Sequence, residues 1–317
     1  MTSEPHVPHA KYEQLIARAR CLAPAPTVVV HPCDESSVSA ATAAAEQGLI
    51  LPVLVGPRAK IEAAARQAKA DISAFRLVDA PHSHAAAARG VGLIHEGAGT
   101  MLMKGSLHTD ELMHEVMNAA TGLRTERRLS HVFVMDVPSY ADTLLITDAA
   151  INIFPDLDTK RDIVQNAIDL HNMIGLGIPR VAILSAVETV TTKIPSTIDA
   201  AALCKMAERG QITGGLVDGP LAFDNAIDME AARIKGITSD VAGRAQILVV
   251  PDLEAGNMLA KNLTFLSGAD AAGVVVGARV PIVLTSRADS VRARMASCAI
   301  AALYAHARLN QTGVIAT

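Results

Sequence analysis

The sequence predicts an α/β fold made of parallel strand–helix–strand units, and three observations support this prediction. Short runs rich in Val and Ile, such as 27–30, 51–55 and 280–285, alternate with segments of helical periodicity. The chain is 50% hydrophobic but only 3% aromatic, a composition suited to Ala-rich helices packed on a β-branched sheet. The strand at 280–285 leads directly into a helix, and such a connection carries ligands in doubly wound sheets.

The elements expected before residue 130 follow this alternation. Helical patterns cover 12–22, 36–47, 59–69, 84–95 and 110–120, and strand patterns cover 27–30, 51–55 and 75–78. We expect the glycine-containing stretch Gly97–Gly105 to be a loop. The polar segment Leu123–Leu129 carries three arginines, and we expect it to cross between two domains.

The second half of the chain continues the pattern. We expect strands at 131–137, 144–147, 150–154, 181–185, 216–218, 247–250, 274–276 and 280–285. Helices are expected at 159–173, 198–209, 224–235, 256–266 and from residue 287 onward. No helical pattern separates the strands at 144–147 and 150–154, which indicates either an antiparallel excursion or a bulged strand.

Length, charge and cysteine content exclude several classes of function. The 317 residues suffice for one large or two medium domains. The net charge of −4, without any basic block, argues against nucleic acid as a partner. Four scattered cysteines are typical of reduced intracellular thiols. The first residues hold no apolar signal core and no apolar run is long enough to cross a bilayer, so we expect a soluble cytoplasmic protein.

A helix-start signal follows the strand at 280–285. Ser286 and Asp289 form an S-x-x-D capping pair, and Arg287 would be the first helical residue. Amides at a helix N-terminus attract anions, and an arginine beside them adds positive charge. The same pattern also occurs where the serine only caps the helix, so the residues alone leave both interpretations open.

Two lysines near polar turns could join Arg287 in binding an anion. Lys104 lies in the glycine-containing stretch, and Lys261 lies in a helix shortly after Asn257. Three cations together would suit a phosphate group, whereas each lysine alone would be an ordinary solvent-facing side chain.

Several catalytic signatures are missing from the sequence. There is no complete G-x-G-x-x-G fingerprint, no P-loop and no G-x-S-x-G elbow. His82 and His84 are two residues apart, have no third ligand nearby and resemble a helix start, so we expect no metal site.

Five stretches of the sequence, taken together, resemble the phosphate acetyl/butyryl transferase family. They are GTMLMKGSLHT (99–109), HVFVMDVPSYADTLLITDAAINIFPDL (131–157), GPLAFDNAI (219–227), PDLEAGNMLAK (251–261) and GARVPIVLTSRADS (277–290). The order and spacing of these stretches cover the chain from about residue 25 to its end. The motifs LMKG and LTSRADS look more like those of the phosphate butyryltransferase branch than those of the acetyl branch.

The resemblance implies a fold, a reaction and partners. The implied fold is α/β, with two doubly wound domains around a cleft, similar to isocitrate and isopropylmalate dehydrogenases. We expect residues 1–127 with 275–317 to form the domain that carries the Ser-Arg phosphate site, and 128–274 to be inserted in it. Family members transfer an acyl group between coenzyme A and inorganic phosphate, usually as homodimers. We expect direct transfer in a ternary complex, with coenzyme A as a substrate and no cofactor.

The family's site residues carry over to matching positions of this chain. Ser286 and Arg287 match the pair that binds the phosphate and the acyl oxygen in relatives. Thr109 and Lys261 match residues that line the acyl-phosphate site. The same two motifs contain the other expected phosphate or acyl-phosphate ligands, Lys104 and Asn257.

Two positions depart from the acetyl-specific pattern. His114 replaces an arginine, and Ala293 replaces the aspartate regarded as the base that deprotonates the thiol. Asp289 is therefore a candidate base, although it also fits the role of a helix cap. The alternatives are a metal- and NAD-dependent dehydrogenase of the same two-domain fold, and a non-catalytic regulatory or scaffold homologue, for which Ala293 is the support.

Two other features have both a catalytic and a structural interpretation. A route through a covalent acyl-cysteine is possible in principle. Cys298, however, lies on the apolar face of the last helix, a position that indicates a packing role. Met101, Met103 and Phe223 could line an acyl pocket or belong to the core.

Overall fold

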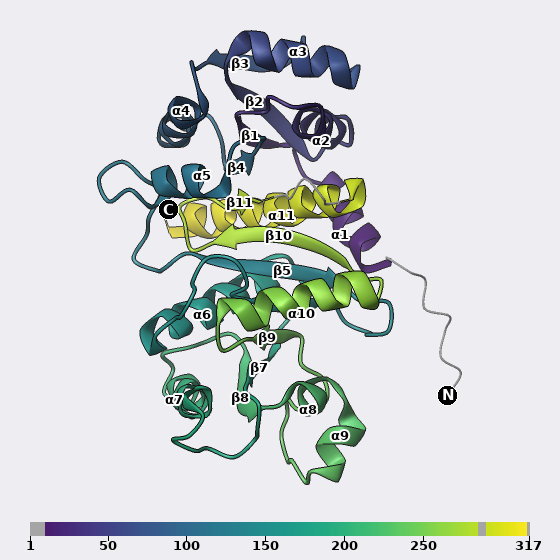
Figure 1. The fold of residues 1–317 in the computed structure, drawn as a ribbon, viewed down its shortest axis with the longest axis vertical. Coiled ribbons are helices and arrows are strands. Elements are labelled where there is room, and N and C mark those ends of the chain that lie inside the picture. Colours follow the sequence, from purple (N-terminus) through teal and green to yellow (C-terminus); the bar gives the residue numbers. More distant parts are fainter. Residues whose placement is uncertain (1–9, 285–289, 316–317) are drawn as a thin grey trace. The chain divides into compact units, whose positions relative to one another are not determined.

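The computed structural model describes residues 10–284 and 290–315 of the chain, and strands and helices alternate along most of it (Figure 1). The helices are α1 (Ala10–Arg20), α2 (Glu35–Glu46), α3 (Arg58–Ala68), α4 (Ser83–His95), α5 (Thr109–Met117), α6 (Leu157–Met173), α7 (Pro195–Glu208), α8 (Phe223–Ile227), α9 (Met229–Ile234), α10 (Leu253–Leu266) and α11 (Val291–Ile315). The strands are β1 (Ala25–Val30), β2 (Ile50–Gly56), β3 (Arg76–Asp79), β4 (Met101–Lys104), β5 (Ser130–Asp136), β6 (Leu144–Thr147), β7 (Arg180–Leu184), β8 (Leu216–Leu221), β9 (Ile247–Val249), β10 (Asp270–Val276) and β11 (Ile282–Val283). The predicted α/β class is confirmed.

Internal contacts divide the chain into two units, which are described separately below. The flanking unit consists of Tyr12–Arg127 and Ala272–Thr317, and the inserted unit consists of Met1–Lys11 and Arg128–Ala271. The predicted domains, 1–127 with 275–317 and 128–274, stay a prediction.

Strands of the flanking unit follow the order β3-β2-β1-β4-β11-β10. Neighbours are parallel along this order up to β11, and β10 is antiparallel to β11. Helices α4 and α5 lie on one side of these strands and α2 lies on the other (Figure 1). This parallel arrangement, with helices on both faces, is that of a doubly wound sheet.

Strands of the inserted unit follow the order β5-β6-β9-β7-β8. Strand β6 is antiparallel to β5, which confirms the antiparallel interpretation of this region, and the other neighbours are parallel. Helices α6 and α7 lie on one side of the strands and α8 and α9 on the other (Figure 1). The carboxyl ends of β6, β9, β7 and β8 therefore share one edge of the sheet.

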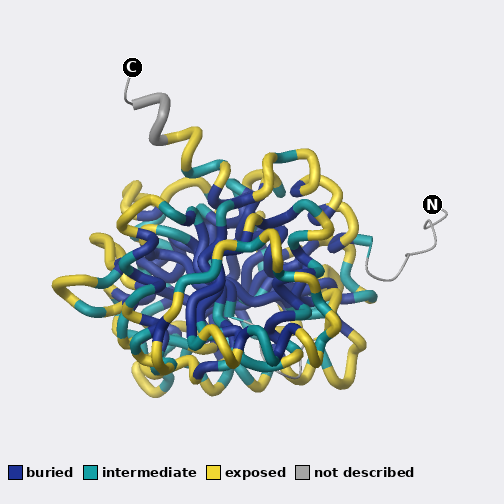
Figure 2. Tube along the Cα trace, turned by 90° about the horizontal axis from the view of Figure 1, so that it is seen from above, coloured by how far each residue is buried: buried dark blue, intermediate teal, exposed yellow. Residues whose placement is uncertain are grey.

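In each unit the buried hydrophobic residues come from the strands and from helices beside them, among them α4 and α11 in the flanking unit and α6 in the inserted unit. Buried stretches occupy the interior of the trace in Figure 2, and exposed residues lie on its outer turns. Met101 and Met103 are buried in β4, so they belong to the core, and Cys298 is fully buried in α11. In the part of the chain that the structure describes, no helix is long and apolar enough to cross a membrane.

One predicted loop contains a strand, and one predicted strand is shorter than expected. The stretch Gly97–Gly105 contains β4, which was missed because its MLMK run is short, lacks β-branched residues and lies between glycines. Strand β11 covers only Ile282–Val283 of the predicted 280–285 within the described residues. Short buried strands carry too few residues for periodicity to mark their ends.

Side-chain caps explain two further corrections. No strand forms at 150–154, because the carboxylate of Asp148 binds the backbone amides that follow it and turns the chain. The single helix predicted at 224–235 is two helices, α8 and α9. The break falls at Asp228, whose carboxylate accepts a hydrogen bond from the amide of Ala231 at 2.7 Å and caps α9.

Candidate functional site

The strand order of the flanking unit reverses between β1 and β4. From β1 the chain continues to β2 and β3 on one side, and β4 and β11 lie on the other side, parallel to β1. In doubly wound sheets, ligands bind outside the carboxyl ends of the strands at such a reversal. The residues that follow β1, from His31, and those that follow β4, from Gly105, form the candidate site of this unit.

The segment Lys104–Thr109 leaves the carboxyl end of β4. The Nζ of Lys104 donates to the carbonyl oxygens of Gly105 at 3.2 Å and Leu107 at 3.1 Å, and these bonds hold the segment in a tight turn. A Cβ at position 105 would lie 2.5 Å from the carbonyl oxygen of Val30. Only glycine therefore allows the segment to lie directly against the end of β1.

Thr109, a predicted ligand, is exposed at the first position of α5. The residue before it, His108, makes no side-chain capping bond with the helix, so the first amides of α5 lack that partner. These amides and the Thr109 hydroxyl are suited to an anion. Asp110 and Glu111 bring negative charge to the same turn, so a bound anion would need the ammonium of Lys104 as a counter-charge.

His31 was not singled out by the sequence motifs, yet it lies at the point where the strand order reverses. Its Nδ1 is 3.1 Å from the hydroxyl oxygen of Ser106, and that hydroxyl is 2.8 Å from the carbonyl oxygen of His31 itself. The backbone φ of His31 is 54°, a left-handed conformation that is uncommon outside glycine. Burial lowers the pKa of His31, and the positive charge of Lys60 lowers it further.

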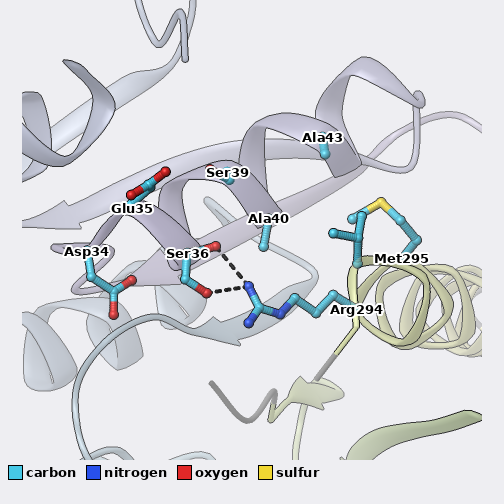
Figure 3. A pocket seen from close by; sticks show the side chains of 9 residues that line it. Asp34, Glu35, Ser36, Ser39, Ala40, Ala43, Arg294 and Met295 are labelled. Carbon is cyan, nitrogen blue, oxygen red and sulfur yellow. Dashed lines mark hydrogen bonds between the residues drawn. The ribbon is translucent and has the colours of Figure 1, made fainter. Parts of the chain in front are cut away.

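A cavity of about 560 Å³ lies between α2 and the start of α11 (Figure 3). The guanidinium of Arg294 donates to the carbonyl oxygen of Ser36 at 3.0 Å and links the two helices. The amide of Ala293 is capped by the hydroxyl of Ser290 at 3.1 Å, and Ala293 is buried. The position where the family resemblance leads one to expect an acidic base therefore holds no ionisable group. The cavity is lined by Asp34, Glu35, Ser36, Ser39, Ala40, Ala43, Val291, Arg294 and Met295.

The predicted catalytic residues Ser286, Arg287 and Asp289 lie outside the described residues. They follow β11 in the sequence, and their roles stay a prediction.

The other two predicted ligands, Asn257 and Lys261, lie on α10 of the inserted unit, one helical turn apart. The Nδ2 of Asn257 donates to the carbonyl oxygen of Ala149 at 3.3 Å, and this bond ties α10 to the loop after β6. A Cβ at Gly256 would lie 3.0 Å from the Cβ of Ala149, so glycine permits this close packing. Lys261 is exposed, and its ammonium makes no hydrogen bond or ion pair with a described residue.

The loop beside Asn257 is organised by Asp148, which the sequence motifs did not identify as a site residue. Its carboxylate accepts hydrogen bonds from the amides of Ala150 at 2.9 Å, Ile151 at 3.1 Å and Asn152 at 3.1 Å. The Nδ2 of Asn152 donates to the same carboxylate at 2.6 Å. Burial raises the pKa of Asp148, and these four bonds to the carboxylate oppose that shift. Asp148 thus fixes the shape of the loop that Asn257 contacts.

The cysteine thiols of the site region and the core are poor nucleophiles. Burial raises the pKa of Cys33 to about 11 and those of Cys204 and Cys298 to about 12. A thiol with such a pKa is protonated at neutral pH. The buried position of Cys298 agrees with the predicted packing role.

His82 begins a helix, as predicted. Its Nδ1 accepts a hydrogen bond from the amide of Ala85 at 3.2 Å and caps α4. Residues 10–284 and 290–315 contain no group of three or more His, Cys, Asp or Glu side chains placed to hold a metal ion.

Comparisons with known sequences agree with the motifs. A family model described as phosphate acetyl/butaryl transferase matches residues 82–302. The chain is 75% identical to the phosphate acetyltransferase of Rhizobium meliloti, over 94% of this chain and 95% of the relative. It is 55% identical to the phosphate acetyltransferase of Rickettsia felis, over 93% of this chain and 85% of the relative. It is 42% identical to the phosphate butyryltransferase of Clostridium acetobutylicum, over 86% of this chain and 90% of the relative. The relatives at 75% and 55% identity carry the acetyl name, whereas the LMKG and LTSRADS motifs favoured the butyryl branch.

Solved structures share the fold. A branched-chain phosphotransacylase from Enterococcus faecalis is 30% identical, covers 88% of this chain and 99% of its own, and has a TM-score of 0.76. A 4-hydroxythreonine-4-phosphate dehydrogenase from Klebsiella pneumoniae has a TM-score of 0.54 over 89% of this chain and 99% of its own, at 12% identity, which shows a common fold alone. The match to the family model and the identity to these relatives show that the chain belongs to the phosphate acetyl/butyryl transferase family.

Proposed function

We propose that this chain catalyses the transfer of an acetyl group between coenzyme A and inorganic phosphate. The observation that carries the proposal is the 75% identity, over nearly the whole of both chains, to a protein named phosphate acetyltransferase. The fold and the candidate site are compatible with this reaction, because the reversal of strand order brings cationic and hydroxyl side chains to one sheet edge.

The proposed mechanism is direct transfer in a ternary complex. The phosphate has to be held beside the thioester carbonyl, so that a phosphate oxygen attacks the carbonyl carbon while the thiolate of coenzyme A leaves. In the flanking unit, Lys104, Thr109 and the first amides of α5 would hold phosphate oxygens, together with Ser286 and Arg287. These groups would also stabilise the negative charge that develops on the carbonyl oxygen.

Asn257 and Lys261 of the inserted unit are proposed to take part in the same reaction. The exposed ammonium of Lys261 is available to a substrate anion. The side chain of Asn257 is already bonded to Ala149, so its proposed role is to position the start of α10. Both roles derive from the family resemblance, and the Lys261→Ala substitution described below tests the role of Lys261.

The acyl group is proposed to be acetyl, and butyryl is the second candidate. The LMKG and LTSRADS motifs favour the butyryl branch, and His114 and Ala293 depart from the acetyl-specific pattern. The relatives at 75% and 55% identity are named phosphate acetyltransferase, against 42% identity for the phosphate butyryltransferase of Clostridium acetobutylicum, so we give acetyl priority.

The test is phosphate-dependent release of thiol from acetyl-, propionyl- and butyryl-coenzyme A. We expect release that requires phosphate, is fastest with acetyl-coenzyme A and falls at least about 100-fold in Ser286→Ala and Arg287→Ala. Fastest release from butyryl-coenzyme A would assign the butyryl branch. No release from any thioester would refute the proposed function and favour a dehydrogenase, which would bind NAD, or a scaffold, which would bind neither.

We also propose that the chain acts as a cytoplasmic homodimer. The homodimer rests on the family resemblance, and light scattering of the purified protein tests the dimer directly. A mass near 33.1 kDa would indicate a monomer, and twice that mass would support the dimer.

A further inference from the structure

The candidate site needs a group that takes the proton of the coenzyme A thiol. The aspartate that the family resemblance leads one to expect for this role is replaced by Ala293. Ala293 is buried in α11 and carries no ionisable side chain. A free thiol has a pKa near ~8.5, so only a small fraction is thiolate at neutral pH. A base within the site would therefore speed the reaction with acetyl phosphate.

His31 is placed where such a base is needed. It follows β1 directly at the reversal of strand order, and its ring contacts the segment Lys104–Thr109 through Ser106. Ser106 lies two residues after Lys104 and three before Thr109, the two described residues of this unit proposed to hold the acyl phosphate. The ring is half-buried, so it remains accessible to a substrate.

Hydrogen bonds around Ser106 fix which ring nitrogen carries the proton. The Ser106 hydroxyl has one hydrogen, which it donates to the carbonyl oxygen of His31 at 2.8 Å. The hydroxyl oxygen of Ser106 also accepts a hydrogen bond from the amide of Cys33 at 3.2 Å. At 3.1 Å from this hydroxyl, Nδ1 of His31 is then the donor, which leaves Nε2 unprotonated. No described residue hydrogen-bonds Nε2, so its lone pair is available.

The surroundings keep this imidazole neutral. Burial and the ammonium of Lys60, on α3, lower the pKa of His31. Glu111 on α5 and Asp34 before α2 face the ring from the other elements and act in the opposite direction with smaller effect. A neutral imidazole with a free Nε2 can accept a proton at neutral pH.

We propose that His31 is the general base of the acetyl-transfer reaction, with Nε2 as the accepting atom. In the direction of acetyl-coenzyme A synthesis, Nε2 takes the proton of the thiol, and the thiolate attacks the carbonyl carbon of acetyl phosphate. The new S–C bond forms as the C–O bond to the phosphate breaks, and the electron pair stays on the phosphate oxygen. The proton then passes from Nε2 to that phosphate, which leaves as hydrogen phosphate, and His31 is neutral again. This inference rests on the proposed function.

The test compares His31→Asn with wild type across pH, with His306→Asn as a matched control. Asparagine tolerates the left-handed backbone of position 31, and its amide can still donate to Ser106, so the substitution removes little besides the base. His306 is an exposed residue of α11. We follow thioester formation from acetyl phosphate and coenzyme A.

In wild type we expect the rate to fall as pH drops through the pKa of His31, which lies below the ordinary 6.5. The kcat of His31→Asn at pH 7 should be about 100-fold or more below that of wild type. The variant should also lack this fall of the rate at acidic pH (the acidic limb), and its rate should recover as pH approaches the pKa of the thiol near ~8.5. The KM values should change by less than about threefold, and His306→Asn should behave as wild type.

A second variant and a spectroscopic measurement guard against misfolding of the first. His31→Gly also fits the backbone and leaves space for added imidazole, which we expect to restore activity. Nitrogen NMR of wild type should show neutral His31 with the proton on Nδ1.

Each opposite result overturns the proposal. It fails if His31→Asn keeps the wild-type rate and its acidic limb, if imidazole does not rescue a folded His31→Gly, or if the proton is on Nε2. Loss of the acidic limb in Asp289→Asn but not in His31→Asn would assign the base to Asp289. A wild-type protein that forms no thioester would refute the proposed function itself, whereas an active wild type with an equally active His31→Asn would refute only the role of His31.

Discussion

The contact between Gly105 and the end of β1 leads to a quantitative prediction for Gly105→Ala. A Cβ at this position would lie 2.5 Å from the carbonyl oxygen of Val30 and 2.6 Å from that of His31. Both atoms belong to the backbone, one at the buried end of β1 and one in the residue after it, and cannot rotate away as a side chain could. Because real Cβ contacts are essentially never shorter than 3.0 Å, the segment after β4 has to move by roughly 0.5 Å.

That movement weakens the two hydrogen bonds that join the segment to β1. The amide of Gly105 donates to the oxygen of Val30 at 2.8 Å, and the amide of Ser106 donates to the oxygen of His31 at 2.9 Å. Losing two bonds worth about 0.5–1.5 kcal/mol each, with an overpacking cost of about 1–3 kcal/mol, gives a loss of up to roughly 2–6 kcal/mol. With an unfolding entropy of about 2.1 cal/mol/K per residue, that loss lowers the Tm by roughly 3–9 °C.

The assay is thermal unfolding of Gly105→Ala together with its acetyl-transfer rate. Gly92→Ala is the matched control, because a Cβ there meets only the Nη1 of Arg89 at an ordinary 3.6 Å. Alanine is the better helix former, so Gly92→Ala should raise the Tm by about 1 °C. We expect Gly105→Ala to lose at least about tenfold in kcat/KM, since Lys104 and Ser106 move with it. Wild-type Tm and activity in Gly105→Ala would refute the close approach of this segment to β1.

Three further predictions concern buried charges and the exposed lysine of α10. Burial lowers the pKa of His131 to about 4 from 6.5, so the unfolded chain binds the proton more tightly and stability falls as pH drops below 6.5. The free energy of unfolding should be about 2 kcal/mol lower at pH 5 than at pH 7. Urea unfolding at the two pH values should show this difference in wild type and its absence in His131→Phe. The buried ammonium of Lys160 lies 2.7 Å from the carboxylate of Asp199, and Asp199→Ala leaves it without this partner. We therefore expect urea unfolding to show that Asp199→Ala loses about 2–4 kcal/mol of stability. Glu208→Ala, which removes a partner from an exposed ion pair, should lose at most about 0.5 kcal/mol. Lys261→Ala should lower kcat/KM by about 10–150-fold, the value of one charge-assisted hydrogen bond, and a Tm changed by several degrees would instead assign Lys261 a structural role.

Most elements of this fold could be predicted from periodicity alone. Strands β1, β2, β5 and β7 are apolar, β-branched runs, and the Ala-rich helices between them repeat with the helical period. The missed strand β4 shows where periodicity fails. Its first three residues are buried on both faces between β1 and β11, so no alternation marks the strand, and glycines on both sides suggest a loop.

The candidate site was predicted in part. The motifs led to the prediction of Lys104, Thr109, Asn257 and Lys261, because each lies in a short stretch of sequence, and their roles stay a prediction. Asp148 was missed, although its carboxylate holds the loop beside Asn257 through four hydrogen bonds. Its role depends on the direction in which three consecutive amides point, and a linear pattern does not contain that information.

The position of His31 could not be found in the sequence, because its partner Ser106 is 75 residues away. The structure adds a second observation, the left-handed φ of 54°, which costs a side chain with a Cβ about 1–2 kcal/mol. Glycine would avoid this cost, so a purely structural His31 predicts that His31→Gly keeps its activity and gains stability. A general base predicts that His31→Gly gains or keeps stability but loses activity. Strained residues are common at functional sites, because function can retain a residue that costs stability. Measuring Tm and kcat on the same His31→Gly variant therefore separates the structural role from the catalytic role.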